Sequence, residues 1–397
     1  MLKYMRRAME LAENGRRSVS PNPVVGCVLV RDGKIIAEDW HREYGKGHAE
    51  RNLLGALEGE VLPDDVLMVT LEPCCHQGKS GACTDIILEK GVKKVVVGVL
   101  DPNPEVGGKG VSLLREMGLD VMVMESSKST IQNPTNTDIK NSPFKFCSLS
   151  FELVEELIWQ NRGFFTWVTK RRPWVTLKMA QSLDGRITPE KGQSYWLTGP
   201  ESREHVHKQR AQFDAILVGV GTVMVDNPML TVRLEKSKIQ STKSKNPRVV
   251  VLDAALSVPL ESEVMREGTM VFRGRQFKKR LAQKKLMEDR GVVVIEVDTD
   301  EDGYLNLRQI LDELAAAGMT SLYVEGGPRI WSSFLNADLV DEVNVYLAPE
   351  FLGNGEVSLP EFQGSSKKIQ FKEWKQLGDD VMWRGLFVTD GIERSIE

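Results

Sequence analysis

His48-Ala49-Glu50, followed downstream by Glu72-Pro73-Cys74 and by Cys83, is the most specific feature of this 397-residue sequence. One imidazole and two thiolates give zinc three protein ligands and leave its fourth tetrahedral position open for water. An open position is typical of a catalytic zinc, which lowers the pKa of that water toward neutrality. Glu50 stands two residues beyond the histidine, where its carboxylate can move protons without binding the metal. These residues predict a hydrolytic zinc site.

A structural zinc clasp and an unmetallated cysteine cluster are the alternatives for these residues. Cys75 or His76 could complete a four-ligand structural site. Glu50 has no use in a clasp, and His-x-Glu followed by Pro-Cys and a further cysteine is the pattern of zinc-dependent nucleobase deaminases. Three of the chain's five cysteines fall within ten residues, which favours a metal site in a reducing compartment over a disulfide framework.

The residues around these motifs predict an α/β unit with a mixed sheet. Asp32-Gly33 supplies the two positive φ angles of a tight turn, so the flanking apolar runs 24–30 and 35–37 read as a hairpin. Apolar residues at helical spacing precede the hairpin over residues 2–14. Helices and strands then alternate, with helices at 48–57 and 83–90 and strands at 66–70 and 95–99.

The chain is long enough for two domains, because one core rarely grows beyond about 250–300 residues. Residues 125–145 are polar and carry no sustained period, so they cannot bury enough apolar area to offset their ordering entropy. We therefore predict domains at 1–150 and 151–397, with a linker over about 125–147. A helix over Phe151–Asn161 is expected to lead into the second domain.

In the second half, two glycine-rich loops follow predicted strands. Gly219-Val220-Gly221-Thr222 comes after the strand 215–218, and Glu325-Gly326-Gly327-Pro328 comes after the strand 322–324. Glycines at such positions let backbone N–H groups approach a phosphate, although close packing explains a bare Gly-x-Gly equally well. The full Gly-x-Gly-x-x-Gly pattern is absent, which argues against a Rossmann domain. Two loops from separate strands could instead embrace one nucleotide cofactor.

Charge and hydropathy exclude several classes of partner. The net charge of −4 and the pI near 5.9 provide no global positive field for nucleic acid or an anionic membrane. No apolar run approaches the ~20 residues that span a bilayer, and the charged first fifteen residues do not resemble a signal peptide. We expect a cytoplasmic protein. The lysine-rich stretch 236–245 is interpreted as a solvated loop rather than a contact for a cofactor phosphate.

The N-terminal half resembles the deaminase domain of the bifunctional riboflavin-synthesis deaminase/reductases. The resemblance is carried by Ser20 to Val28, His48-Ala49-Glu50, Thr70 to His76, Cys83-Thr84-Asp85 and Asp101-Pro102-Asn103-Pro104. Eight residues separate the two ligand cysteines, as in the riboflavin branch, whereas cytidine-type deaminases have two. Cys75 stands where the family usually has serine, and Ser80-Gly81-Ala82 replaces its usual Thr-Pro-Pro.

That resemblance implies a cytidine deaminase-like three-layer α/β domain. It makes Glu50 the proton shuttle and gives the zinc ligands as His48, Cys74 and Cys83. It also implies that Asn22 and His76 help to hold the substrate.

The second half resembles the reductase domain of the same family, which has a dihydrofolate reductase-like fold. The matching segments include Lys178 to Gly185, Ser194 to Gly199, Asp226 to Arg233 and Leu339 to Glu342. The resemblance implies NADPH contacts from Ala180, Trp196, Thr222, Asp226 and the loop beginning at Gly327. It implies substrate contacts from Lys178, Ser194, Arg210, Leu230, Arg233 and Glu325.

Single residues of this half carry less specific signals. The guanidinium forks of Arg210 and Arg233 suit a phosphate dianion, although each taken alone is more often a surface cation. Asp226 and Glu325 suit ribose hydrogen bonding or proton delivery, or else helix capping and turn formation. NADPH would supply the hydride, while the protein supplies orientation and charge.

The resemblance implies deamination of a diaminopyrimidinone ribosyl phosphate followed by NADPH reduction of its ribosyl chain to ribityl. The residues alone support a zinc amidine hydrolase joined to a nucleotide-using domain. The alternative enzyme is a nucleic-acid or free-base deaminase with an accessory nucleotide-binding domain, which the acidic pI and the long cysteine spacing disfavour. A nucleotide-sensing scaffold is disfavoured by the intact His-Ala-Glu box. A homo-oligomer is expected by family analogy.

Overall fold

The computed structural model describes residues 1–76, 81–103, 106–124, 149–234, 246–277, 280–364 and 366–388. The chain divides into two compact units, Met1–Lys170 and Arg171–Thr389. Each unit has a hydrophobic core of its own. The polar stretch 125–147, Cys147 and the lysine-rich stretch 236–245 lie outside the described residues.

The sheet of the first unit is mixed, and its strands run in the order β2-β1-β3-β4-β5. The hairpin β1–β2 turns at Asp32 and Gly33, whose φ angles of 47° and 74° are those predicted from the sequence. β1 is antiparallel to β3, while β3, β4 and β5 are parallel. The strands are β1 (Gly26–Arg31), β2 (Lys34–Trp40), β3 (Val66–Leu71), β4 (Lys94–Val99) and β5 (Asp120–Val123).

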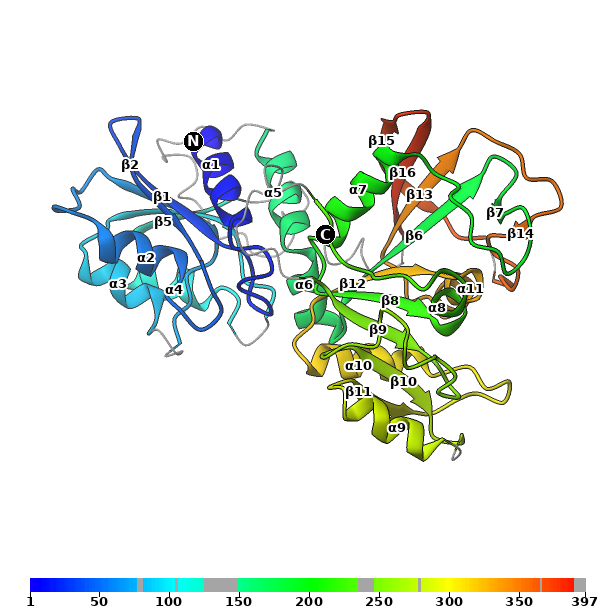
Figure 1. Cartoon of the computed structure of the whole chain (residues 1–397). Coiled ribbons are helices and arrows are strands. Elements are labelled where there is room, and N and C mark those ends of the chain that lie inside the picture. Colours follow the sequence, from blue (N-terminus) through cyan, green and yellow to red (C-terminus); the bar gives the residue numbers. More distant parts are fainter. Residues whose placement is uncertain are drawn as a thin grey trace. The chain divides into compact units, whose positions relative to one another are not determined.

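Helices cover both faces of this sheet, so the first unit has three layers (Figure 1). α1 and α5 lie on one face, and α2, α3 and α4 lie on the other. α1 buries Met5, Ala8, Leu11 and Ala12, the face that its helical spacing predicts. The helices are α1 (Leu2–Glu13), α2 (Ala49–Ala56), α3 (Cys83–Glu89), α4 (Lys109–Glu116), α5 (Leu149–Gln160) and α6 (Arg162–Lys170).

The division between the units falls later in the chain than the sequence led us to place it. We expected a boundary near residue 150, at the beginning of α5. The structure groups α5 and α6 with the first unit, because Leu153, Val154 and Leu157 of α5 belong to that unit's core. A polar stretch marks where the chain leaves a sheet, but it does not show which core the next helix joins.

The second unit is built on a long sheet with the strand order β11-β10-β9-β8-β12-β6-β13-β16-β15. The strands from β11 to β13 are parallel, and β16 and β15 add antiparallel pairs at one edge. They are β6 (Trp174–Ser182), β8 (Ala215–Gly219), β9 (Arg248–Leu252), β10 (Met270–Gly274), β11 (Val293–Val297), β12 (Ser321–Gly326), β13 (Glu342–Ala348), β15 (Ile369–Leu377) and β16 (Asp380–Phe387). A small separate pair is formed by β7 (Arg186–Thr188) and β14 (Glu356–Val357).

The order of the parallel strands reverses between β8 and β12, which are neighbours. From β8 the chain adds β9, β10 and β11 toward one edge of the sheet. It then returns to β12, beside β8, and continues to β13 in the direction of the opposite edge. Ligands of open α/β sheets bind at such a switch point, beyond the carboxyl ends of the strands. The helices of this unit are α7 (Pro200–Arg210), α8 (Val220–Asp226), α9 (Leu281–Glu288), α10 (Leu307–Ala316) and α11 (Pro328–Asn336).

Over the described ranges, no helix is long and apolar enough to cross a membrane.

Candidate active sites

The structure brings the three predicted zinc ligands together in the first unit. His48 immediately precedes α2, Cys74 lies in the loop after β3, and Cys83 is the first residue of α3. Their ligand atoms all lie within 4.8 Å of one another. His48 Nδ1 is 3.5 Å from the Sγ atom of Cys74 and 3.4 Å from that of Cys83. Tetrahedral zinc with bonds of about 2.3 Å to sulfur and about 2.0 Å to nitrogen would separate these atoms by about 3.6 Å, so the residues fit the metal.

The surroundings of Cys74 favour the thiolate that a metal requires. The Cys83 thiol and then the His48 ring stabilise the charged form by hydrogen bonding, and together they lower the pKa of Cys74 to about 4. The backbone N–H of Cys83 also donates to Cys74 Sγ at 3.4 Å. A depressed thiol pKa next to a cationic or hydrogen-bonding partner is typical of reactive and metal-binding cysteines.

Glu50 lies in the first turn of α2 and is only 2% exposed. Burial, followed by the negative charge of Cys74, raises the pKa of this carboxyl group to about 7. Its side chain is also within hydrogen-bonding reach of Cys83. A group with a pKa near the working pH can both accept and release a proton, which suits the predicted shuttle.

Asn22 is joined to the zinc ligands through His41, a residue that sequence reasoning missed. Asn22 Nδ2 lies 3.3 Å from His41 Nε2, and His41 Nδ1 lies 3.0 Å from the carbonyl oxygen of Gly47. The His41 ring meets the His48 ring edge-on with a centroid separation of 5.0 Å. Burial lowers the pKa of His41 to about 4, so its Nε2 can accept from the Asn22 amide.

The chain has five histidines, and His41 directly follows β2, seven residues before the His-Ala-Glu box. Scarcity and nearness to the box are weak signals, but they could have drawn attention to this residue.

Cys75 and His76 are placed apart from the ligand cluster. In the part of the chain that the structure describes, the group able to hold a metal consists of His48, Cys74 and Cys83, without a fourth member. His76 is exposed and lies close enough to Asp101 to affect that carboxyl group electrostatically. Three ligands and an adjacent buried carboxyl group favour an open, catalytic site over a structural clasp.

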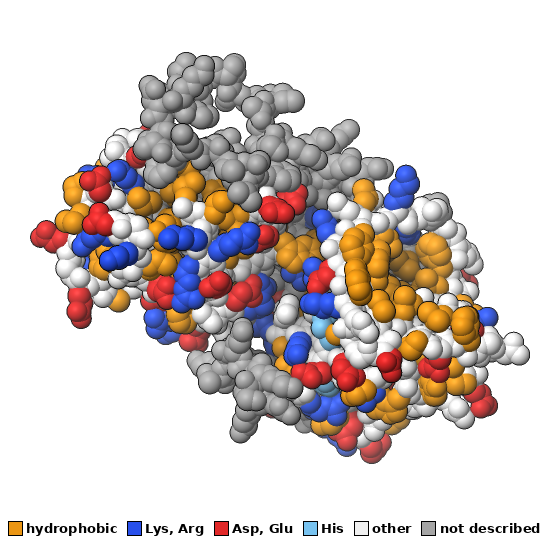
Figure 2. Space-filling model, turned by 90° about the horizontal axis from the view of Figure 1, so that it is seen from above, with side chains coloured by type: hydrophobic (Ala, Val, Ile, Leu, Met, Phe, Trp, Pro, Cys, Tyr) orange, Lys and Arg blue, Asp and Glu red, His pale blue; other side chains and the backbone are white. Residues whose placement is uncertain are grey.

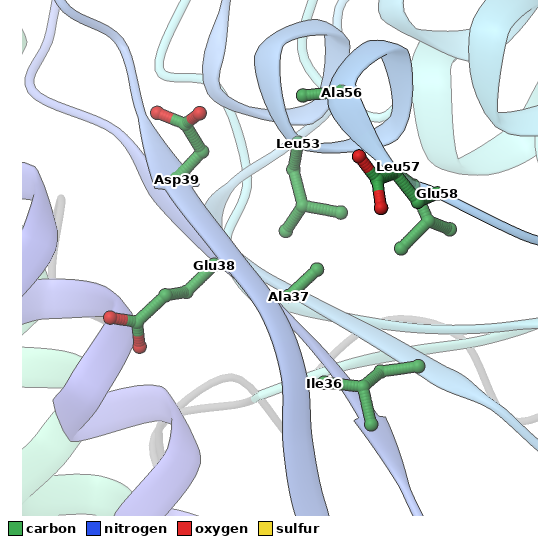
Figure 3. Close-up of a pocket in the computed structure, with 8 residues that line it drawn as sticks. All are labelled: Ile36, Ala37, Glu38, Asp39, Leu53, Ala56, Leu57 and Glu58. Carbon is green, nitrogen blue, oxygen red and sulfur yellow. The ribbon is translucent and has the colours of Figure 1, made fainter.

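A hollow of about 280 Å³ on the first unit lies between β2 and α2 and does not include the zinc ligands. Figure 3 shows that the carboxylate of Glu38 points away from it, and this group accepts hydrogen bonds from Arg7 on α1. Asp39 is similarly paired with Arg42. The residues lining the hollow are Ile36, Ala37, Glu38, Asp39, Leu53, Ala56, Leu57 and Glu58.

In the second unit, Arg210 and Glu325 bind each other. Arg210 Nε and Nη2 donate to the two carboxylate oxygens of Glu325 at 2.5 and 2.7 Å, and both side chains are largely buried. The guanidinium fork that we expected to bind a phosphate is therefore engaged by another predicted substrate contact. Arg210 lowers the pKa of Glu325 below its ordinary value despite burial, and the charge of nearby Lys178 on β6 adds to this effect.

The two predicted glycine loops meet at the switch point. Gly219 ends β8 and Gly326 ends β12, and these strands are adjacent and parallel. Gly327 has a φ angle of 89°, and a Cβ atom there would lie 3.1 Å from Thr222 Oγ1. Nothing lies within 4 Å of the position that a Cβ on Gly221 would occupy, so the backbone is open there. The arrangement fits a cofactor phosphate or ribose seated between the loops.

The other predicted contacts of the second unit differ in their exposure and surroundings. Leu230 is buried in a core cluster, so its side chain faces other apolar residues. Trp196 is 74% exposed and lies beside Arg203, whose guanidinium group is 4.8 Å from the ring centroid. The backbone N–H of Arg233 donates to His207 Nδ1. Ala180 is half-buried, and Ser194, Asp226 and the Arg233 residue as a whole are exposed.

The comparisons with known proteins cover both units. Residues 1–99 match the cytidine and deoxycytidylate deaminase zinc-binding region, and residues 173–383 match the RibD C-terminal domain. The riboflavin biosynthesis protein RibD of Aquifex aeolicus is 37% identical over 386 residues, which is 96% of each chain. RibD of Escherichia coli is 34% identical over 95% of this chain and 97% of its own length.

Solved structures agree with these matches. Form 1 of Acinetobacter baumannii RibD has a TM-score of 0.80 and 30% identity, and 98% of each chain is covered. The diaminohydroxyphosphoribosylaminopyrimidine deaminase/5-amino-6-(5-phosphoribosylamino)uracil reductase of Thermotoga maritima has a TM-score of 0.78 and 33% identity, with 97% of this chain and 98% of that chain covered. The predicted fold class, a cytidine deaminase-like domain and a dihydrofolate reductase-like domain, is confirmed. The chain belongs to the RibD family of riboflavin biosynthesis enzymes, which unite a zinc-dependent deaminase with an NADPH-dependent reductase.

Proposed function

We propose that this chain catalyses two successive steps of riboflavin synthesis on one pyrimidine ribosyl phosphate. The first unit would deaminate 2,5-diamino-6-ribosylaminopyrimidinone 5'-phosphate to the corresponding uracil. The second unit would reduce the ribosyl chain to ribityl and give 5-amino-6-ribitylaminouracil 5'-phosphate. The observation that carries the proposal is the His48, Cys74 and Cys83 cluster beside buried Glu50, in a chain that RibD proteins match almost from end to end.

In the deaminase unit, bound zinc would supply a water molecule of lowered pKa as the nucleophile. Glu50 would take a proton from this water and pass it to a ring nitrogen of the pyrimidine as the hydroxyl group adds to the ring carbon. It would then take the proton of that hydroxyl group and pass it to the exocyclic amine, so that the carbonyl group forms and ammonia leaves. Burial of Glu50 keeps its carboxyl group ready for both directions of transfer, because the pKa lies near neutrality. Asn22 and His76 are proposed as substrate contacts, with the Asn22 amide oriented by His41.

In the reductase unit, NADPH would supply the hydride that reduces the opened ribosyl chain. We place the cofactor across the switch point, against Thr222, Asp226 and the loop beginning at Gly327, with Ala180 and Trp196 nearby. Lys178 on β6, Glu325 on β12 and Arg210 at the end of α7 form a charged cluster. We assign this cluster to binding of the substrate. Ser194, Leu230 and Arg233 complete the proposed substrate contacts. The backbone of Leu230 would make its contact, because the side chain lies in the core.

A nucleic-acid or free-base deaminase is not favoured. More than half of the chain matches the RibD C-terminal domain, which such an enzyme would not need. Figure 2 shows lysine and arginine side chains interspersed with acidic ones over one face of the molecule. Interspersed charge gives little field to gather a polyanion.

We further propose that the protein works in the cytoplasm as a homo-oligomer. The free state of Cys27, Cys74, Cys75 and Cys83 fits a reducing compartment. The proposal of an oligomer is supported by β15, the edge strand of the long sheet, where the apolar side chains of Phe371 and Trp374 are more than half exposed. Light scattering of the purified protein measures the number of subunits directly.

The proposed function is tested with the purified chain and the first intermediate. Metal analysis should find one zinc ion per chain. Ammonia release should precede NADPH oxidation, and the already deaminated compound should support NADPH oxidation without ammonia release. Absence of both activities in zinc-loaded, folded protein would overturn the assignment.

A further inference from the structure

Asn161, between α5 and α6 of the first unit, makes two hydrogen bonds to the backbone of Val24. The Val24 N–H donates to Asn161 Oδ1 at 2.9 Å, and Asn161 Nδ2 donates to the Val24 carbonyl oxygen at 2.9 Å. Asn161 and Val24 are each 5% exposed, so water does not compete for these bonds. A carboxamide presents an acceptor and a donor side by side, and both are used on a single residue.

The junction between α5 and α6 is also hydrogen-bonded to α1 and to the loop that follows α1. Gln160 Nε2 donates to the carbonyl oxygen of Met9 at 2.9 Å and to Glu13 Oε1 at 2.7 Å. Arg16 Nη2 donates to the backbone carbonyl oxygen of Gln160 at 3.0 Å. These bonds tie Gln160, the residue before Asn161, to α1 and to Arg16 in the loop that follows it, and they limit the movement of Asn161 relative to both.

The loop that contains Val24 also contains Asn22, a proposed substrate contact. Val24 stands two residues after Asn22, whose amide meets His41, and His41 in turn bonds to the carbonyl oxygen of Gly47, next to the zinc ligand His48. The backbone between Asn22 and Val24 is short, so fixing Val24 limits where the Asn22 amide can point. The path from Asn161 to His48 consists of hydrogen bonds, the two peptide units between Asn22 and Val24, the side chains of Asn22 and His41, and the peptide group of Gly47.

We propose that Asn161 is a positioning residue of the deaminase site, acting through Val24 on Asn22. The inference rests on the proposed function, because Asn22 is taken as a substrate contact. It means that the helix pair leading toward the reductase unit completes the deaminase site, so the deaminase needs residues that lie beyond its sheet.

The test uses the full chain with Asn161→Asp, which keeps the acceptor but sets a carboxylate oxygen against the Val24 carbonyl group. We expect deaminase kcat/KM to fall about tenfold, mostly through KM. Zinc content and NADPH-dependent reduction of the deaminated compound should remain unchanged. The matched control is Glu155→Gln on the exposed side of α5, which should leave both activities at the wild-type level.

A double-mutant cycle with Asn22→Ala separates positioning from general structure. If Asn161 acts through Asn22, the Asn161→Asp change should raise KM little further in the Asn22→Ala background. Full additivity of the two effects would overturn the proposal, as would wild-type deaminase kinetics in Asn161→Asp. Should Asn161→Asp fail to bind zinc, Asn161→Ser, which can keep one of the two bonds, decides the matter: retained zinc with raised KM supports positioning, and lost zinc overturns it.

Failure of the underlying function is recognised separately. Wild-type protein that binds zinc but releases no ammonia from the pyrimidine would refute the deaminase assignment. An active wild type with an unaffected Asn161→Asp variant refutes only the role of Asn161.

Discussion

Arg210 and Glu325 form a two-point ion pair in which the guanidinium Nε and Nη2 meet the two carboxylate oxygens at 2.5 and 2.7 Å. Arg210 ends α7 and Glu325 lies near the carboxyl end of β12, so the pair joins a helix to the switch point of the sheet. Both side chains are largely withdrawn from water, at 12% and 7% exposure. Removing either partner would leave the other as an uncompensated buried charge.

Glu325→Gln should therefore destabilise the second unit by about 3–5 kcal/mol, the usual effect of breaking a buried ion pair. Reductase kcat/KM should fall as well, while ammonia release should persist. Urea unfolding followed alongside both activities measures these effects. Glu301→Gln, at an exposed position, is the control and should change neither quantity. A second unit of unaltered stability would show that the pair contributes no net free energy.

His205 should make the stability of the second unit depend on pH. Burial, followed by the nearby charge of Lys375, lowers the pKa of His205 from 6.5 to about 4, and His205 Nδ1 lies 2.8 Å from the Tyr346 hydroxyl group. The unfolded chain takes up a proton near pH 6.5, but the folded chain does so only near pH 4. The contribution of His205 to the free energy of unfolding therefore has its full value above about pH 6.5 and decreases as the pH drops toward about 4.

The slope should stay below the limit of about 1.4 kcal/mol per pH unit for one proton, because His205 is partly exposed. Urea unfolding at several pH values between 4 and 7 measures it. His205→Gln keeps a polar partner for Tyr346 but cannot titrate, so its slope should be smaller. An identical slope in the variant would exclude His205 as the source.

Glu50→Ala should lower deaminase kcat at least about 100-fold, because a positioned proton shuttle contributes about 10²–10⁴ in rate. Glu50→Gln should lose as much, since an amide of the same shape cannot carry the proton. NADPH oxidation with the already deaminated compound should remain at the wild-type rate in both variants. Exposed Glu43→Gln is the control. Loss of both activities in folded Glu50→Ala would argue against two separable sites.

Zinc removal should abolish ammonia release and spare the reductase. Treatment with a chelator and restoration with zinc alone test this reversibly. Cys83→Ser should reduce bound zinc to well below one ion per chain, because a ligand is lost. Cys75→Ser should keep full zinc content and activity, since Cys75 stands outside the ligand cluster. Equal zinc loss in both variants would place Cys75 among the ligands.

Gly327→Ala should weaken NADPH binding and lower the stability of the second unit by about 1–3 kcal/mol, the cost of holding a side chain in a sparsely populated backbone region. The residue has a φ angle of 89°, which L side chains rarely adopt, and its new Cβ would lie 3.1 Å from Thr222 Oγ1. KM for NADPH and urea unfolding are the measurements. Gly221→Ala, which meets no atom within 4 Å, should leave stability unchanged or slightly raised. Unchanged values in Gly327→Ala would show that the loop relaxes without cost.

Local chemistry let the sequence predict the zinc site and much of the fold. Ligand types, their spacing and a neighbouring carboxylate specify the metal chemistry wherever His48, Cys74 and Cys83 come together. The Asp32-Gly33 turn and the glycine loops at the ends of β8 and β12 are equally local, because backbone dihedral angles and strand ends depend on adjacent residues.

Only the tertiary structure could pair residues that lie far apart in the chain. Arg210 and Glu325 are 115 positions apart, and Val24 and Asn161 are 137 apart. The sequence contains both members of each pair but does not show that they meet, because any cation can pair with any carboxylate, and a carboxamide can bond to any backbone group that lacks another partner. Strand order and helix packing choose among them, and that choice also decided that α5 and α6 join the core of the first unit.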